Sequence, residues 1–174
     1  MANVATFEAG TAQLLMGNEG IARGALEAGI GFASAYPGNP SSDIIGTLAD
    51  VAADAGIYVE WSINEKVALE AAAAAAFAGV RSICAMKHNG LNVVLDFLMG
   101  LNVTGTKAGL VLVTCDDPGA LSSTEEEDSR PVAKWACVPL LEPATFQEEK
   151  DMTRWAFELS EQFKTIFLLR GVTR

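Results

Sequence analysis

The residue of this sequence best suited to proton chemistry is Glu65, which follows a short apolar run at residues 57–61. A carboxyl group in a poorly solvated crevice has a raised pKa and can share a proton with a ligand nitrogen. Ser62 and Glu65 also have the spacing of a capping box, in which both side chains bond backbone N–H groups at a helix start. Spacing alone favours the capping role, and both roles stay open.

A second candidate segment is the turn at residues 36–42, which reads Tyr-Pro-Gly-Asn-Pro-Ser-Ser. Two prolines around a glycine make this turn rigid, and the serines place free backbone N–H groups at the start of the next helix. Such a turn suits ligand binding. An ordinary strand-to-helix turn with a cap would explain the same residues.

The third candidate segment, residues 87–92, contains His88, the only histidine of the chain. A lone histidine in a loop is more often an ordinary polar residue than a catalyst. Its neighbours Lys87, Asn89 and Asn92 are also polar, and the segment follows an apolar run at residues 82–86. This clustering at an expected strand end favours a role in a site.

A long acid-rich segment begins with Asp116 and Asp117 and continues to Arg130. Paired carboxylates can hold Mg²⁺. The commoner explanation of such a run is a solvated loop. The length of this segment in an otherwise compact domain suggests a loop that binds a ligand or docks a partner.

These segments must be positioned by strands and helices that alternate along the chain. Apolar runs predict strands at residues 31–35, 57–61, 82–86, 110–115, 137–141 and 165–169, and helices are expected at 18–28, 42–55, 62–79, 91–101 and 145–162. Strands that are apolar throughout and separated by helices predict a doubly wound α/β fold with a mostly parallel sheet. Ligands bind such sheets beyond the carboxyl ends of the strands, where all four polar segments are expected.

Length and charge limit the possible functions. We expect residues 1–174 to form a single domain, and the formal net charge of −10 argues against nucleic acid or an anionic membrane as a partner. No apolar run reaches membrane-spanning length, and no secretory leader is expected at the start. Cys84, Cys115 and Cys137 lack metal-ligand spacing, so we expect no metal site there, buried free thiols at Cys84 and Cys115, and a cytoplasmic location.

Several of these motifs, in this order and at this spacing, resemble one known family. Residues 36–42, 64–70, 86–92, 116–119 and 169–174 are similar to the N-terminal domain of indolepyruvate ferredoxin oxidoreductase alpha subunits, and the resemblance runs from about Met16 to the end of the chain. It implies a fold like the pyrimidine-binding domain of thiamine-diphosphate enzymes.

The resemblance also implies roles for individual residues. Glu65 matches the catalytic glutamate that bonds N1′ of the aminopyrimidine of thiamine diphosphate. The turn and the segment around His88 would line the thiazolium and substrate side. The cofactor-binding residues implied in this way are Tyr36, Pro37, Gly38, Asn39, Pro40, Glu65, Lys87, His88, Asn89 and Asn92.

The implied reaction is the oxidative decarboxylation of a 2-oxoacid. Iron–sulfur clusters accept the electrons, and coenzyme A takes the acyl group. The chain shows no Gly-Asp-Gly segment with a downstream asparagine for Mg²⁺ and diphosphate, and no cysteine cluster for iron and sulfur. The resemblance therefore implies a diphosphate-binding subunit and an iron–sulfur or ferredoxin protein as partners in a hetero-oligomer.

Two departures from the family bear on the substrate. The family usually has threonine where this chain has Asn39, and pyruvate-specific members carry an arginine near Cys115 and Asp116. The missing arginine argues against pyruvate, and Asn39 leaves the substrate open; the resemblance itself implies an aryl pyruvate. The alternatives are a split non-redox 2-oxoacid decarboxylase, a non-catalytic assembly or regulatory module of the same fold, and a receiver-like signalling domain that would use Asp116 and Asp117.

Overall fold

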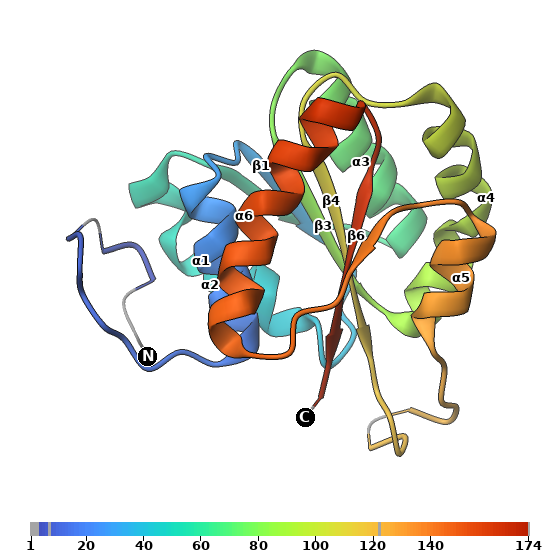
Figure 1. Cartoon of the computed structure of the whole chain (residues 1–174), viewed down its shortest axis with the longest axis horizontal. Helices are drawn as coiled ribbons and strands as arrows, with labels where there is room; N and C mark the ends of the chain where they lie inside the picture. The colour runs from blue at the N-terminus through green and yellow to red at the C-terminus, as the bar shows by residue number, and fades with distance from the viewer. Residues whose placement is uncertain (1–3, 7, 122, 174) are drawn as a thin grey trace.

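A parallel sheet of six strands forms the centre of the molecule (Figure 1). The computed structural model describes residues 4–6, 8–121 and 123–173. Neighbouring strands pair in the order β2-β1-β3-β4-β6-β5, and every pair is parallel. The strands are β1 (Phe32–Ala35), β2 (Tyr58–Trp61), β3 (Ser82–Lys87), β4 (Leu110–Asp116), β5 (Leu140–Leu141) and β6 (Phe167–Val172).

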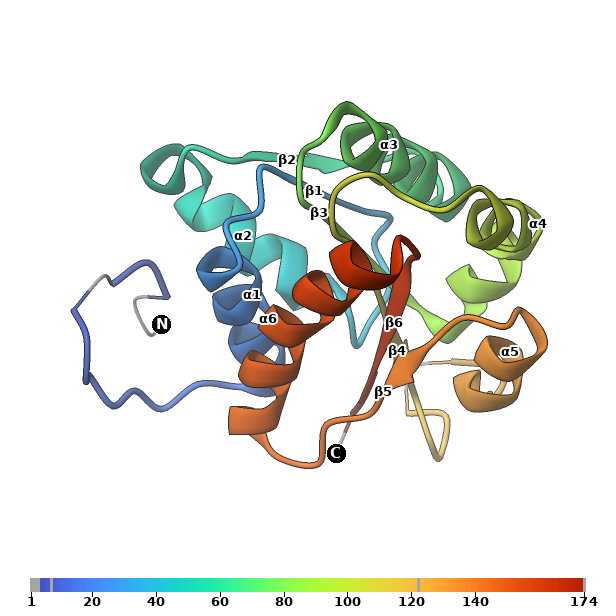
Figure 2. The same ribbon diagram turned by 45° about the horizontal axis from the view of Figure 1, so that its top comes forward.

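Helices cover both faces of this sheet, as Figure 2 shows. One face carries α1 (Gly17–Glu27), α2 (Ser42–Ala55) and α6 (Phe146–Phe163). The other carries α3 (Glu65–Ala78), α4 (His88–Thr104) and α5 (Ser129–Trp135). The predicted doubly wound α/β fold is confirmed.

The alternation of side chains along the central strands separates the core into two layers. Ile83 of β3 and Val111 of β4 point to the layer beneath α1, α2 and α6. Cys84 and Leu112, the next residues along, point to the layer beneath α3, α4 and α5. Because both faces are covered, β3 and β4 are buried at every position, which explains why their sequences are mostly apolar.

Three elements differ clearly from the sequence-based expectation, and one of them is β5, which is only Leu140–Leu141 where a strand at 137–141 was predicted. The segment before Leu91 was predicted as a loop, but α4 begins at His88, so the first helical turn follows β3 directly. The α5 helix was not predicted, because its seven residues are too few to show a helical period. Among the helices of the described residues, none is both long and apolar enough to cross a membrane.

The carboxyl ends of the strands lie together at one edge of the sheet. In Figure 1 this edge is at the bottom, where the end of β6, the segment after β4 and the first turn of α4 are found. The turn at residues 36–41 follows β1, and Glu65 follows β2 after three intervening residues. The fold therefore brings the polar segments to the edge where ligands bind such sheets.

Candidate functional site at the carboxyl edge of the sheet

Glu65 is the first residue of α3 and does not cap it. The cap is Asn64, whose Oδ1 accepts a hydrogen bond from the Val67 N–H at 2.9 Å. Ser62 instead continues the strand, because its N–H donates to the Ala35 carbonyl at 2.8 Å. The capping box predicted for Ser62 and Glu65 is therefore wrong. The Glu65 carboxyl group does not cap the start of α3.

The half-buried Glu65 side chain lies between the first turns of α3 and α4. A Cβ atom built on Gly90 would be 2.5 Å from Glu65 Cγ and 3.0 Å from its Oε1. Burial raises the pKa of the nearby Cys84 thiol to about 12, and the charge of Glu65 adds to this rise. No hydrogen bond from the described residues reaches the Glu65 carboxylate, so its oxygens are available to a ligand.

The turn at residues 36–41 is fixed by its own serines. The Gly38 N–H donates to Ser42 Oγ at 2.9 Å, and both the N–H and Oγ of Ser41 donate to the Gly38 carbonyl at 3.0 and 2.7 Å. The expectation that these serines leave free backbone N–H groups is therefore wrong for Ser41. Tyr36 remains 40% exposed at the surface. The peptide bond between Asn39 and Pro40 is cis.

This turn lies directly against the start of α4. A Cβ atom at Gly38 would be 3.2 Å from Lys87 Cβ. This is closer than an ordinary van der Waals contact, so a side chain at position 38 would require Lys87 to move slightly. Lys87 in turn forms an ion pair with Asp117, with 3.3 Å between Nζ and Oδ2 and both side chains at least 90% buried. Two of the predicted site segments are thus in contact, and the second is joined to the start of the acid-rich segment.

His88 is completely buried in the first turn of α4. Neither of its ring nitrogens has a hydrogen-bond partner within the part of the chain that the structure describes. Buried polar groups in proteins nearly always have a partner, and an exception marks a place for a ligand or a bound water. His88 therefore keeps its place as a candidate site residue.

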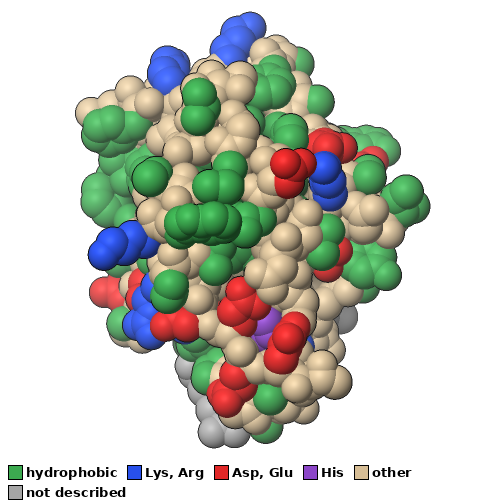
Figure 3. Space-filling view, turned by 90° about the vertical axis from the view of Figure 1, so that its right-hand side faces the viewer, with side chains coloured by type: hydrophobic (Ala, Val, Ile, Leu, Met, Phe, Trp, Pro, Cys, Tyr) green, Lys and Arg blue, Asp and Glu red, His purple; other side chains and the backbone are tan. Residues whose placement is uncertain are grey.

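The acid-rich segment covers the exposed side of the same turn. The Asn89 amide donates to Glu125, and the Asn92 amide donates to Glu127 Oε2 at 2.7 Å. Figure 3 shows acidic side chains gathered around the histidine on this face of the molecule. The predicted binding residues Asn89 and Asn92 are thus in contact with carboxylates of the chain itself.

Asp116 and Asp117 are fully buried, so the solvated-loop interpretation is wrong for this pair. Asp116 Oδ2 accepts from Arg170 Nε at 2.6 Å and from the Ser129 N–H at 3.0 Å, and Ser129 Oγ donates to Oδ1. Arg170 also bonds Glu142. This network ties both ends of the acid-rich segment to β6. No group of three potential metal ligands occurs among the described residues.

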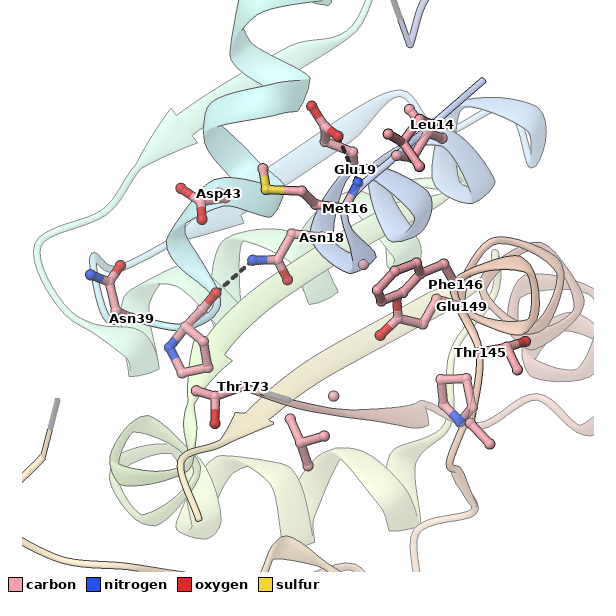
Figure 4. A pocket seen from close by; sticks show the side chains of 17 residues that line it. Leu14, Met16, Asn18, Glu19, Asn39, Asp43, Thr145, Phe146, Glu149 and Thr173 are labelled. Carbon is pink, nitrogen blue, oxygen red and sulfur yellow. Dashed lines mark hydrogen bonds between the residues drawn. The ribbon is translucent and has the colours of Figure 1, made fainter. Parts of the chain in front are cut away.

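A pocket that the sequence did not indicate lies on the other side of the turn (Figure 4). It encloses about 810 Å³ between the starts of α1 and α6, and Asn39 and Pro40 form part of its wall. The Asn18 amide donates to the Pro40 carbonyl there at 2.6 Å. Glu149 Oε2 is buried without a partner among the described residues, and burial raises the pKa of this carboxyl group. Glu65 and His88 are not part of this pocket.

A known family model matches most of this chain. The family described as pyruvate flavodoxin/ferredoxin oxidoreductase, thiamine diphosphate-binding, matches residues 23–170. The chain belongs to this family. The resemblance seen in the motifs is therefore confirmed over most of the sequence.

Relatives within the pyruvate flavodoxin/ferredoxin oxidoreductase family cover nearly the whole chain. The indolepyruvate oxidoreductase subunit IorA of Pyrococcus abyssi is 52% identical over 161 residues, and that of Methanothermobacter marburgensis is 54% identical over 160 residues. Both alignments cover 92% of this chain. The 2-oxoglutarate synthase subunit KorA of Methanothermobacter thermautotrophicus is 29% identical over 164 residues, which cover 90% of this chain and 43% of that subunit.

A solved structure has the same fold. The 2-oxoglutarate:ferredoxin oxidoreductase from Magnetococcus marinus, with 2-oxoglutarate, coenzyme A and succinyl-CoA bound, superposes with a TM-score of 0.81 at 19% identity, over 91% of this chain and 29% of that one. The chain spans about a quarter of the length of the two IorA relatives, 25% and 26%.

Proposed function

We propose that residues 1–174 form the pyrimidine-binding domain of a thiamine-diphosphate-dependent 2-oxoacid:ferredoxin oxidoreductase. The observation that carries the proposal is the state of Glu65. Its carboxyl group sits at the carboxyl edge of the sheet, relieved of capping by Asn64 and without a hydrogen bond from the described residues. A carboxyl group so placed can bond a ligand nitrogen, which is the role that N1′ of the aminopyrimidine requires.

The residues present fit this cofactor. Because Gly90 has no side chain, there is space for the Glu65 side chain beside it, and the carboxyl group can lie between α3 and α4 at the edge of the sheet. The ring nitrogens of His88, which are buried and have no partner among the described residues, supply polar atoms on the neighbouring helix α4. Bound thiamine diphosphate supplies the electron-accepting ring that lets a 2-oxoacid lose carbon dioxide.

The chain's own contribution is to bind and orient. In this proposal Glu65 is the catalytic residue, because it holds a proton at N1′ and so fixes the ring and tunes the basicity of its amino group. The rigid turn and the first turn of α4 face the cofactor and the substrate. The cofactor-binding residues we propose are Tyr36, Pro37, Gly38, Asn39, Pro40, Glu65, Lys87, His88, Asn89 and Asn92.

Other chains or domains complete the reaction. We propose that a diphosphate-binding partner holds Mg²⁺ and the diphosphate, that iron–sulfur clusters in a partner accept the electrons, and that coenzyme A takes the acyl group. We propose a cytoplasmic setting for this complex. The substrate we propose is an aryl pyruvate, because identity is 52–54% to the two IorA relatives named for indolepyruvate and 29% to the KorA relative named for 2-oxoglutarate.

The test is the substitution Glu65→Gln in the full-length protein assembled with its partner. We expect 2-oxoacid-dependent reduction of a dye, in the presence of thiamine diphosphate, to fall by roughly 10²- to 10⁴-fold, the usual contribution of a positioned acid–base group. Glu70→Gln is the matched control, since Glu70 is exposed on the same helix. Activity of Glu65→Gln equal to that of the control would reject the proposal.

The same assay separates the alternatives. A split non-redox decarboxylase would release carbon dioxide without reducing the dye. A non-catalytic module would bind its partner with no thiamine-dependent turnover at all. Phosphorylation of Asp116 or Asp117 by a small phosphodonor would indicate a receiver-like domain, and the burial of both side chains argues against it.

A further inference from the structure

Gly90 lies in the first turn of α4, where the side chain of Glu65 passes from α3. A Cβ atom at position 90 would be 2.5 Å from Glu65 Cγ, 3.0 Å from Glu65 Oε1 and 3.0 Å from Met86 Cβ. Its backbone is not in the left-handed region, so conformation does not require glycine here. What requires glycine is the space taken by Glu65.

The neighbours of Gly90 cannot easily move away. Met86 is fully buried in β3, and its Cβ is fixed by the backbone of a central strand. Glu65 Cγ is set by a single side-chain torsion, and few values of that torsion are allowed in a helix. A methyl group at position 90 would therefore turn the Glu65 carboxyl group to another direction or separate α3 from α4.

We propose that Gly90 is a positioning residue for Glu65. Here the missing side chain lets the Glu65 carboxyl group lie close to α4 at the edge of the sheet. This inference rests on the proposed function, because it specifies how the glutamate is aimed at the pyrimidine ring.

Gly100 provides a matched control on the same helix. It is exposed, and no atom lies within 4 Å of a Cβ atom built on it. Gly90→Ala and Gly100→Ala therefore make the same chemical change in one helix, and only the first places a methyl group against Glu65.

The first measurement compares these variants in the full-length protein assembled with its partner and thiamine diphosphate. We expect Gly90→Ala to lower kcat about 10- to 100-fold, since a displacement of about 1 Å at a catalytic group can cost 10²-fold. The KM for the 2-oxoacid should stay within about threefold of the wild-type value, because the substitution displaces Glu65, which contacts the cofactor in this proposal. Exchange of the thiazolium C2 proton with solvent should slow by the same factor as kcat. Gly100→Ala should remain within about twofold of the wild type in each readout.

The second measurement needs no cofactor and uses the melting temperature of the same protein. We expect Gly90→Ala to lower Tm when Glu65 is present, and to lower it much less in a Glu65→Ala background, where the overlapping Cγ is absent. If Gly90→Ala alone does not fold, recovery of folding in the double variant supports the same contact. Equal Tm shifts in both backgrounds would overturn the inference.

The outcomes distinguish this inference from the proposed function. Activity retained in Glu65→Gln would reject the function itself. Loss of activity in Glu65→Gln together with full activity and unchanged proton exchange in Gly90→Ala would reject only the positioning role of Gly90.

Discussion

The ion pair between Arg170 of β6 and Asp116 of β4 gives the clearest test of how the edge of the sheet is held. Nε and Oδ2 are 2.6 Å apart, and the two side chains are 10% and 1% exposed. Removing one partner of a buried pair typically costs 3 to 5 kcal/mol, because the other charge is left without compensation. Asp116 would keep two hydrogen bonds from Ser129, so we expect Arg170→Met to cost about 3 kcal/mol.

This loss can be measured as a change in melting temperature. For a chain of this size, 1 kcal/mol shifts Tm by about 2 to 4 °C, so we expect Arg170→Met to lower Tm by about 6 to 12 °C. Arg154→Met is the matched control, because Arg154 pairs with Glu158 at 3.6 Å and both side chains are more than half exposed. Exposed pairs contribute about 0 to 1 kcal/mol, so the control should change Tm by no more than about 4 °C. Equal shifts in the two variants would refute the view that burial makes the Arg170 pair important.

Two further predictions concern ionisable groups. Burial raises the pKa of the Cys84 and Cys115 thiols to about 12. We therefore expect a thiolate-specific reagent at pH 8 to label only the exposed Cys137 in the native chain. Labelling of more than one of these three thiols before unfolding would contradict this prediction. Burial also raises the pKa of Glu149, so the folded chain binds this proton more tightly than the unfolded chain does. The resulting contribution to stability is present below the unfolded pKa and is lost as pH rises through the folded pKa. We therefore expect Glu149→Gln to raise Tm at pH 7 and to lose this gain below about pH 4, and a gain of the same size at both pH values would show that the carboxyl group is not responsible.

The sheet and its ligand edge could be predicted because they depend on local pattern. Apolar runs such as residues 110–115 are continuous only where a strand is buried on both faces, and glycines such as Gly56 and Gly79 mark helix ends through their left-handed backbone. These signals are sufficient to place the turn after β1 and Glu65 after β2 at the same edge.

The exact starts of α3 and α4 were harder to predict than those of α2 and α6, whose caps Ser41 and Thr145 were expected from the sequence. Ser62 and Asn64 can both cap α3, and only the strand bond from the Ser62 N–H to the Ala35 carbonyl decides for Asn64. At α4 the cap position is Lys87, which forms no side-chain cap bond, so the sequence carries no start signal there.

Long-range partners could not be predicted at all. Asp116 belongs to a segment that looks solvated until Arg170, 54 residues later, is known to lie beside it. The buried state of Glu149 likewise depends on the packing of α6 against α1, the last helix against the first. A single sequence offers no local pattern for such pairs.

The strand order has a consequence for synthesis on the ribosome. Because β6 inserts between β4 and β5, and α6 packs against α1, the nascent chain cannot close its sheet until its final strand has emerged. Until then the edge of β4 that pairs with β6 is unpaired, and the Asp116 carboxylate lacks its ion-pair partner Arg170. We expect this domain to fold late and as one unit, since contacts distant in sequence are the last to form.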